Sequence, residues 1–237
     1  MAGRLVVCPT PIGNLEDVTL RVLSALREAD VVACEDTRRT RTLLARYGVS
    51  APLVSYHEHN EQRRSAELVS RMQAGETVAL VSDAGTPALS DPGEALVAAA
   101  IAAGHTVTPI PGPNAAIAAL VASGLPTRAF TFLGFVPKKT GQRQRLLAGL
   151  IAEGRTIVVY ESPYRTGDLL ADVAALAPDA RVVVARELTK VHETFVRGTA
   201  QDLAARYAAE RPKGEVTVVI APADTDARGE HAVESDV

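Results

Sequence analysis

Short apolar runs alternate with helical patterns through the first half of this chain, and this alternation is its most constraining feature. The apolar runs that predict strands are 4–8, 31–34, 52–56, 77–82 and 105–110. The segments with helical periodicity that follow them are 19–29, 36–47, 61–75, 93–103 and 113–124. Such alternation is typical of βαβ units, so it predicts a mostly parallel sheet with helices on both faces.

The second half of the chain changes character. Its predicted strands are 129–135, 156–160, 180–186, 192–198 and 215–221, with helices near 140–152, 165–176 and 199–209. The short spacing between 180–186 and 192–198 suggests a hairpin, and hence a mixed sheet. Gly and Pro in "SGLPT" (123–127) indicate a boundary. We therefore expect an α/β protein with an N-terminal domain (1–123), a C-terminal domain (124–222) and a tail (223–237).

Composition narrows the class further. With 237 residues the chain can bury a real core without staples. Cys8 and Cys34 lie in apolar runs without other ligands at metal spacing, so we interpret them as core residues and expect no metal. His57 and His59 also lack an evident third ligand. No run approaches the roughly 18 apolar residues of a membrane span, and a cytoplasmic location without membrane attachment is expected.

Charge is unevenly distributed along the chain. The net charge of −3 argues against a bulk nucleic-acid coating. The tail from Ala223 holds five acidic residues and Arg228, a net charge of −4 that leaves +1 for residues 1–222. The tail lacks aromatic residues and periodicity, which predicts disorder.

A polar or turn-rich segment follows each of the first five predicted strands. These segments are "PTPIGN" (9–14), "EDTRRT" (35–40), "YHEHN" (56–60), "SDAGTPALSDPG" (82–93) and "PGPNAA" (111–116). In a parallel sheet all five emerge at one edge, where the ligands of open α/β sheets bind. We therefore expect a ligand site there rather than five unrelated loops.

The loops favour some ligands over others. They contain neither the GxGxxG nor the GxxxxGK pattern, and their prolines remove the backbone donors that cradle phosphate. An adenosine-type ligand with an amine and a sulfonium suits them better. Asp83 could accept hydrogen bonds from such a ligand or offset its charge, although a simple Asx-turn is an equal alternative.

Two locally basic segments, 38–46 and 137–145, are candidates for RNA contact. The side chains that we assign to this role are Arg38, Arg41, Lys138, Lys139 and Arg143. The second segment follows Phe132 and Phe135, and cations beside aromatic rings suit single-stranded RNA. A solvated helix face and a basic helix start remain the alternative interpretations.

Seven blocks of the sequence, in order, resemble one family. They are "TPIGNLEDVTLR", "EDTRRTRTLL", "SDAGTPALSDPG", "PIPGPNA", "FLGFVPKK", "YESPYR" and "ELTKVHE", within residues 5–221. They are similar to the 16S ribosomal RNA cytidine 2'-O-methyltransferases I of the tetrapyrrole-methylase-like superfamily. The resemblance implies two α/β domains with S-adenosylmethionine (SAM) in the cleft between them, usually a homodimer, and methylation of a cytidine ribose in the decoding region of the small ribosomal subunit.

The resemblance also implies which residues contact the cofactor. They are Ile12, Asp83, Thr86, Asn114, Ala115, Tyr160, Ala185 and Glu215. Asn114 stands where relatives more often carry Ser. Related members methylate corrinoid precursors or diphthine intermediates, so the fold alone does not choose the substrate.

Proton handling is expected to involve Glu35, Asp36 and Lys190. A ribose hydroxyl must lose its proton as it attacks a methyl group. Lys190 lies in "ARELTKVHE" (185–193) beside Glu187 and Glu193, so we expect it to stay charged and to steady the oxyanion, while Glu35 or Asp36 takes the proton. Two rivals remain, a small-molecule methyltransferase of the same fold and a non-catalytic SAM-containing ribosome-binding module.

Overall fold

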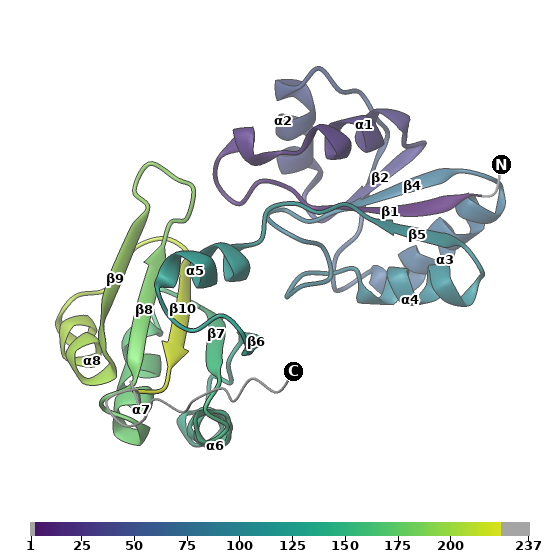
Figure 1. Ribbon diagram of the computed structural model, residues 1–237. Helices are drawn as coiled ribbons and strands as arrows, with labels where there is room; N and C mark the ends of the chain where they lie inside the picture. The colour runs from purple at the N-terminus through teal and green to yellow at the C-terminus, as the bar shows by residue number, and fades with distance from the viewer. Residues whose placement is uncertain (1–2, 224–237) are drawn as a thin grey trace, which may run out of the picture. The chain divides into compact units, whose positions relative to one another are not determined.

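The computed structural model describes residues 3–223, and the tail predicted to be disordered lies almost wholly outside them. The chain divides after Ala115 into two compact units (Figure 1). Each unit has a sheet and a core of its own. Among the described residues, no helix has both the length and the apolar character that crossing a membrane requires.

The first unit is built on a parallel sheet. Its strands are β1 (Arg4–Cys8), β2 (Val31–Cys34), β3 (Leu53–Ser55), β4 (Thr77–Val81) and β5 (Thr106–Pro109). They are arranged in the order β3-β2-β4-β1-β5, and every pairing is parallel. The expectation of a parallel N-terminal sheet is therefore confirmed, and the end of each strand lies at the same edge.

Helices cover both faces of this sheet (Figure 1). They are η1 (Leu15–Asp17, a 3₁₀ turn), α1 (Leu20–Glu28), α2 (Thr37–Arg46), α3 (Glu61–Gln73) and α4 (Glu94–Ala102). Alternate residues of β1 point to opposite faces, so Val6 packs with α1 and α2, while Leu5 packs with α3 and α4. Cys8 and Cys34 are buried as expected, and burial raises the pKa of Cys8 to about 12.

The second unit contains a mixed sheet. Its strands are β6 (Phe130–Phe135), β7 (Thr156–Glu161), β8 (Arg181–Arg186), β9 (Thr194–Thr199) and β10 (Val216–Ala221). Their order is β6-β7-β10-β8-β9, with β6 and β7 parallel and the other pairs antiparallel. The β8–β9 pair is the hairpin expected from the sequence, so the mixed C-terminal sheet is confirmed.

Four helices accompany this second sheet. They are α5 (Ala115–Ser123), α6 (Thr140–Ala152), α7 (Thr166–Leu176) and α8 (Ala200–Ala209). Residues of α6, α7 and α8 share one core with one face of the sheet. On the other face, Tyr160 Oη accepts the Ala116 N–H at 3.3 Å, and Arg197 donates to the carbonyl of Ala122. These contacts group α5 with the second unit, although the sequence placed the boundary near Ser123.

Candidate active site

The loops after β1 and β4 are joined to each other because these two strands are neighbours in the sheet. Thr10 and Gly85 exchange backbone hydrogen bonds of 2.8 and 2.9 Å, and Thr10 Oγ1 donates to the Ser82 carbonyl at 2.9 Å. The "SDAGTPALSDPG" loop is thus anchored to the "PTPIGN" loop at the carboxyl edge of the sheet. The loop is therefore not an independent surface loop.

The backbone of the loop after β4 is strained. Ala88 and Ser90 have φ values of 68° and 63°, in a region that residues with a side chain rarely adopt. Gly93 follows with φ 147°, and a Cβ there would lie 2.9 Å from a methyl carbon of Leu80. The conformations of Ala88 and Ser90 each cost on the order of 1 kcal/mol or more, and strain of this kind clusters at functional sites.

Three loops of the first unit gather several of the expected cofactor residues. Thr86 Oγ1 donates to the Pro113 carbonyl at 3.0 Å, and Asn114 Nδ2 lies 3.4 Å from Thr86 Oγ1. Gly85 faces Ile12, since an added Cβ would lie 3.4 Å from Ile12 Cγ2. Ile12, Thr86 and Asn114 therefore belong to one cluster, while Ala115 begins α5.

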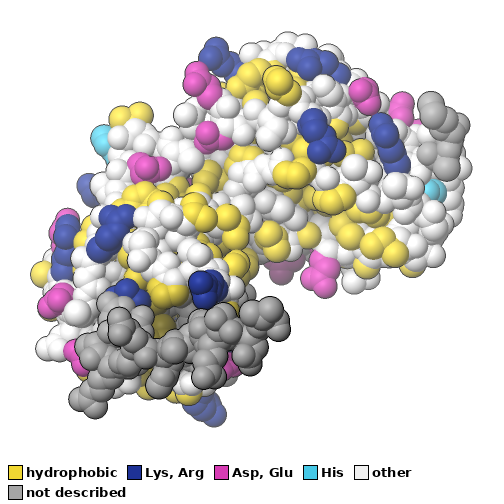
Figure 2. All heavy atoms as spheres, viewed as in Figure 1, with side chains coloured by type: hydrophobic (Ala, Val, Ile, Leu, Met, Phe, Trp, Pro, Cys, Tyr) yellow, Lys and Arg dark blue, Asp and Glu magenta, His cyan; other side chains and the backbone are white. Residues whose placement is uncertain are grey.

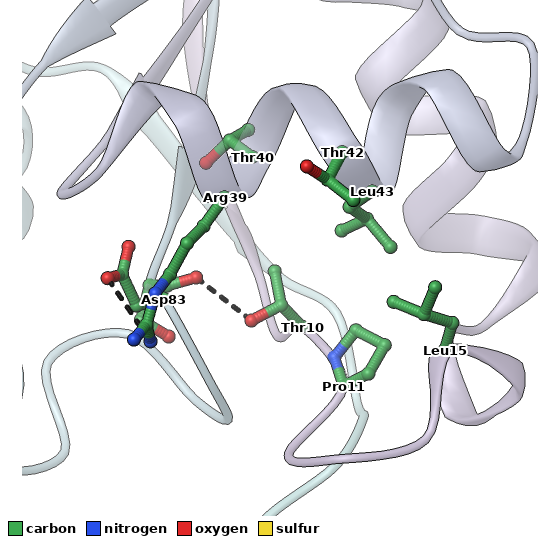
Figure 3. A pocket seen from close by; sticks show the side chains of 9 residues that line it. Thr10, Pro11, Leu15, Arg39, Thr40, Thr42, Leu43 and Asp83 are labelled. Atoms are coloured by element: carbon green, nitrogen blue, oxygen red, sulfur yellow. Dashed lines mark hydrogen bonds and ion pairs between the residues drawn. The ribbon is translucent and has the colours of Figure 1, made fainter.

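Asp83 connects this loop to the start of α2. Its Oδ1 accepts the Asp36 N–H at 2.9 Å, and its Oδ2 lies 3.6 Å from Nη1 of Arg39. Figure 3 shows Arg39 extending from α2 toward Asp83. Both side chains line a hollow of about 230 Å³. The lining of the hollow comprises Thr10, Pro11, Leu15, Arg39, Thr40, Thr42, Leu43, Ser82 and Asp83. The carboxylate is thus held in place from one side and remains 20% exposed on the other.

Three carboxyl groups at this edge have shifted pKa values. Partial burial raises the pKa of Glu35, the negative charge of Asp83 raises it further, and Arg39 opposes them. Burial also raises the pKa of Asp91 to about 6, with Glu35 and Asp83 contributing. Hydrogen bonds from Arg38 lower the pKa of Asp36 to about 2. Of the two predicted bases, Glu35 is therefore the better proton acceptor.

Asp36 has a structural role in addition. It is the N-cap of α2, and its Oδ1 accepts the Arg38 N–H at 2.8 Å. Its Oδ2 pairs with Arg38 Nη2 at 2.8 Å. A carboxylate used in this way stabilises the helix start and holds Arg38 close to the backbone.

In the second unit, Tyr160 and Ala185 flank the same residue of the central strand β10, one from each neighbouring strand. Both pair with Thr217 of β10, Tyr160 from β7 and Ala185 from β8. Residues directly opposite each other in a sheet share a face, so the two lie on the face that carries α5. The structure therefore brings together two of the three second-unit cofactor candidates.

The third of these candidates, Glu215, lies beside Lys190. Lys190 Nζ donates to Glu187 Oε1 at 2.8 Å and to Glu215 Oε2 at 3.0 Å. Partial burial lowers the pKa of Lys190, but the two carboxylates outweigh it and the pKa is raised. Lys190 is therefore an ammonium at neutral pH. Glu193, expected beside it, accepts the Thr189 N–H instead.

The loop that carries Lys190 is also strained. Glu187 and Thr189 have φ values of 52° and 67°. Gly214 has a φ of 84°, which favours glycine, and a Cβ there would also displace the Glu187 carboxyl group. Lys190 is thus fixed by its neighbours rather than free on a hairpin tip.

The five residues assigned to RNA contact do not share one environment. Arg38, Arg41, Lys138 and Lys139 are exposed. Arg143 is only 2% exposed, and its guanidinium pairs with Asp172 at 2.5 Å. The expectation that Arg143 binds RNA is therefore wrong, because a buried, paired guanidinium cannot reach a phosphate. The helical periodicity of 140–152 places Arg143 on the core side of α6, and that signal was available in the sequence.

Sequence reasoning missed two residues of the site. Arg39 occurs in a basic run in which Arg38 and Arg41 were preferred, yet it is Arg39 that reaches Asp83. As the third residue of α2, it faces back toward the loop after β4. Asp91 lies near the end of that loop, and only its burial distinguishes it from an ordinary turn residue. Within residues 3–223, no three His, Cys, Asp or Glu side chains are grouped as metal ligands.

Comparisons with known proteins agree with this architecture. The family model of Tetrapyrrole (Corrin/Porphyrin) Methylases matches residues 4–204. The solved structure of the methyltransferase CobJ has a TM-score of 0.70 at 20% identity, covering 93% of this chain and 95% of that one. Diphthine synthase gives 0.69 at 17% identity, covering 92% and 90%. The fold is therefore that of the tetrapyrrole methylases.

Curated relatives are much closer in sequence. A protein of Mesorhizobium japonicum named ribosomal RNA small subunit methyltransferase I is 50% identical over 94% of this chain and 76% of its own length. A protein of Synechocystis with the same name is 47% identical over 98% and 84%. The chain belongs to the tetrapyrrole methylase family, in the group of ribosomal RNA small subunit methyltransferases I. The resemblance noted in the sequence is thereby confirmed.

Proposed function

We propose that this protein uses SAM to methylate the RNA of the small ribosomal subunit, at the ribose 2'-oxygen of a cytidine in the decoding region. The observation that carries the proposal is a sequence identity of about one half between this chain, over nearly its whole length, and relatives that are named for methylation of that RNA. The choice of the ribose oxygen and of the decoding region comes from the motif resemblance.

The loops of the first unit suit a cofactor of this kind. The Cβ position of Gly85 is in ordinary contact with Ile12 and 3.9 Å from the Pro113 carbonyl, so small residues shape the main chain there. Asp83 presents a carboxylate that can offset a positively charged ligand. Ile12, Asp83, Thr86 and Asn114 would hold the cofactor from this unit, and Tyr160, Ala185 and Glu215 from the other. Its location between the two domains stays a prediction.

The bound cofactor supplies an electrophilic methyl group on a sulfonium. The protein must then hold the ribose, stabilise negative charge on the attacking oxygen and remove its proton. Lys190 is an ammonium held by two carboxylates, and it suits the second task. Glu35, with its raised pKa, suits the third. Alignment of the reacting atoms can account for up to about 7–11 kcal/mol of the barrier.

One edge of the second sheet has the character of an RNA surface. The ends of β6, β7 and β8 and the start of β10 meet there, since Val216 pairs with both Glu161 and Arg186 and Tyr160 pairs with Phe135. Phe135 and Tyr164 are exposed at this edge, at 58% and 74%. Exposed aromatic rings interleaved with cations such as Lys138 and Lys139 bind unstacked bases.

The positive charge is local rather than general. Figure 2 shows Lys and Arg side chains spread over the visible face among acidic ones, without one continuous basic patch. Such a distribution fits a protein that reads a shaped RNA or an assembled subunit better than one that coats RNA. A homodimer, expected from the resemblance, and a cytoplasmic location, expected from the sequence, are part of this proposal.

Mass spectrometry of small-subunit RNA tests the proposal directly. RNA from cells with and without the protein should differ by one 2'-O-methyl group on a decoding-region cytidine. Purified protein with labelled SAM should restore the mark on unmodified small subunits, including in excess chelator. Labelling of a corrinoid precursor instead would favour the small-molecule rival, and SAM binding without transfer to RNA would favour the non-catalytic module.

A further inference from the structure

A hollow lies between α7 and α8, and Tyr164 is its only lining residue to which a role has been given above. Its volume is about 450 Å³, and it is lined by Tyr164, Gly167, Asp168, Tyr207, Arg211 and alanines of both helices. Gly167 allows the two helices to approach, because a Cβ there would lie 2.9 Å from the Tyr207 carbonyl oxygen. The hollow is thus built by a close helix crossing and walled by small side chains.

The position of the hollow follows from the topology of the second unit. Helix α7 begins shortly after β7, and α8 ends before the segment that enters β10 (Figure 1). The end of β7 and the start of β10 pair at Glu161 and Val216. The hollow therefore opens at the same edge of the sheet as Lys190, whose partner Glu215 directly precedes β10.

The side chains at the rim of the hollow suit a flat, polar ring. The Tyr164 ring is 74% exposed, and the Arg211 guanidinium lies 5.8 Å from its centroid. Asp168 is exposed in the first turn of α7, where a carboxylate can accept hydrogen bonds. Together these groups offer a stacking surface, a cation for phosphate and an acceptor for an amino group, which are the three contacts an unstacked nucleotide makes.

We propose that this hollow binds a nucleotide of the substrate RNA other than the one that is methylated, with its base stacked on Tyr164 and its phosphate near Arg211. The inference rests on the proposed function, and it adds a second point of contact at the same sheet edge. Lys213, two residues after Arg211, is exposed as well, and these two cations favour a polyanion over a second copy of this chain.

The test uses wild-type protein, variants of two rim residues and unmodified small ribosomal subunits. Tyr164→Ala and Arg211→Gln should each raise the KM for subunits by about tenfold, because a stacked base contributes roughly 1–3 kcal/mol. Both should leave kcat and SAM affinity near the wild-type values. Tyr164→Phe keeps the ring and should behave like wild type. Arg155→Gln is the matched control, since Arg155 is exposed just before β7, at the opposite edge.

Photocrosslinking gives a second readout that does not depend on activity. Subunit RNA carrying 4-thiouridine should crosslink to the peptide that contains Tyr164 in the wild-type protein. A wild-type KM in Tyr164→Ala together with no crosslink there would overturn the inference and leave the proposed function intact. A change in oligomeric state without a change in KM would also overturn it. Absence of methylation by the wild-type protein would instead overturn the proposed function.

Discussion

Arg39 Nη1 lies 3.6 Å from Asp83 Oδ2, and this contact joins the first turn of α2 to the loop after β4 (Figure 3). The other oxygen of Asp83 accepts the Asp36 N–H. Glu35 directly precedes Asp36 in the sequence. Its carboxyl group is influenced by the charges of both Arg39 and Asp83. Arg39 lowers its pKa and Asp83 raises it. If Glu35 is the base, as we propose, the pair therefore sets the pH range in which it accepts a proton.

Opposite substitutions in this pair should shift the pH profile in opposite directions. Arg39→Gln removes the cation, raises the pKa of Glu35 further and moves the acid limb of methylation to higher pH. Asp83→Asn removes the anion and moves the limb to lower pH. The measurement is kcat against pH with saturating SAM and subunits. Arg46→Gln, on the exposed end of α2, is the control, and identical limbs in all variants would remove Glu35 from proton transfer.

Lys190 should matter for the rate and not for cofactor affinity. Lys190→Met removes the ammonium that we propose stabilises the attacking oxygen, and it should lower kcat about 100-fold, the usual effect of losing one donor to an oxyanion. Lys190→Arg keeps the charge and should retain more activity. Single-turnover methylation and SAM titration separate the two effects. An unchanged rate in Lys190→Met would leave alignment as the main source of acceleration.

The exposed cations should contribute to RNA affinity in a salt-dependent way. Replacing Arg41, Lys138 and Lys139 with Gln should weaken subunit binding and reduce the slope of log K against log salt by about 0.7–0.9 for each phosphate that is no longer neutralised. Arg38 is left unchanged because it pairs with Asp36. The control replaces Arg63 and Arg155, which are also exposed. A slope that moves as much in the control would mean that only general charge matters.

Arg143 should affect stability instead of RNA binding. Arg143→Ala leaves Asp172 buried without its charged partner, which typically costs about 3–5 kcal/mol of unfolding free energy. Arg145→Ala on the same helix, where the side chain is exposed, should change little. Denaturant unfolding of the two variants is the measurement. Equal stabilities would show that water or Gln144 compensates Asp172, since Gln144 Nε2 already donates to it at 2.7 Å.

The sequence predicted the elements better than the side-chain partners. Apolar periodicity depends on neighbours within one element, and it placed α6 at 140–152, where the structure has it. Contacts such as Arg39–Asp83 and Arg143–Asp172 join residues 44 and 29 positions apart and depend on how elements pack. A run of basic residues predicts that one of its side chains faces a ligand or the core. The register of the helix decides which side chain that is.

Asp91 should make the stability of the protein depend on pH. Its pKa in the folded protein is about 6, above its ordinary value of 3.8, so the folded state holds this proton more tightly than the unfolded chain does. Charging Asp91 therefore destabilises the fold progressively between about pH 4 and pH 6, and the full penalty is present above that range.

Asp91→Asn should remove this penalty. The shift of about two pH units corresponds to at most about 3 kcal/mol, and since Asp91 is only partly buried we expect a gain of about 1–2 kcal/mol at pH 8. The gain should shrink as the pH falls through 6 and vanish near pH 4, where wild-type Asp91 is itself protonated. Denaturant unfolding of both proteins at about pH 8, 6 and 4.5 measures the difference. A stability gain that is constant with pH would mean that packing or hydrogen bonding of the amide, and not the charge of Asp91, sets the effect.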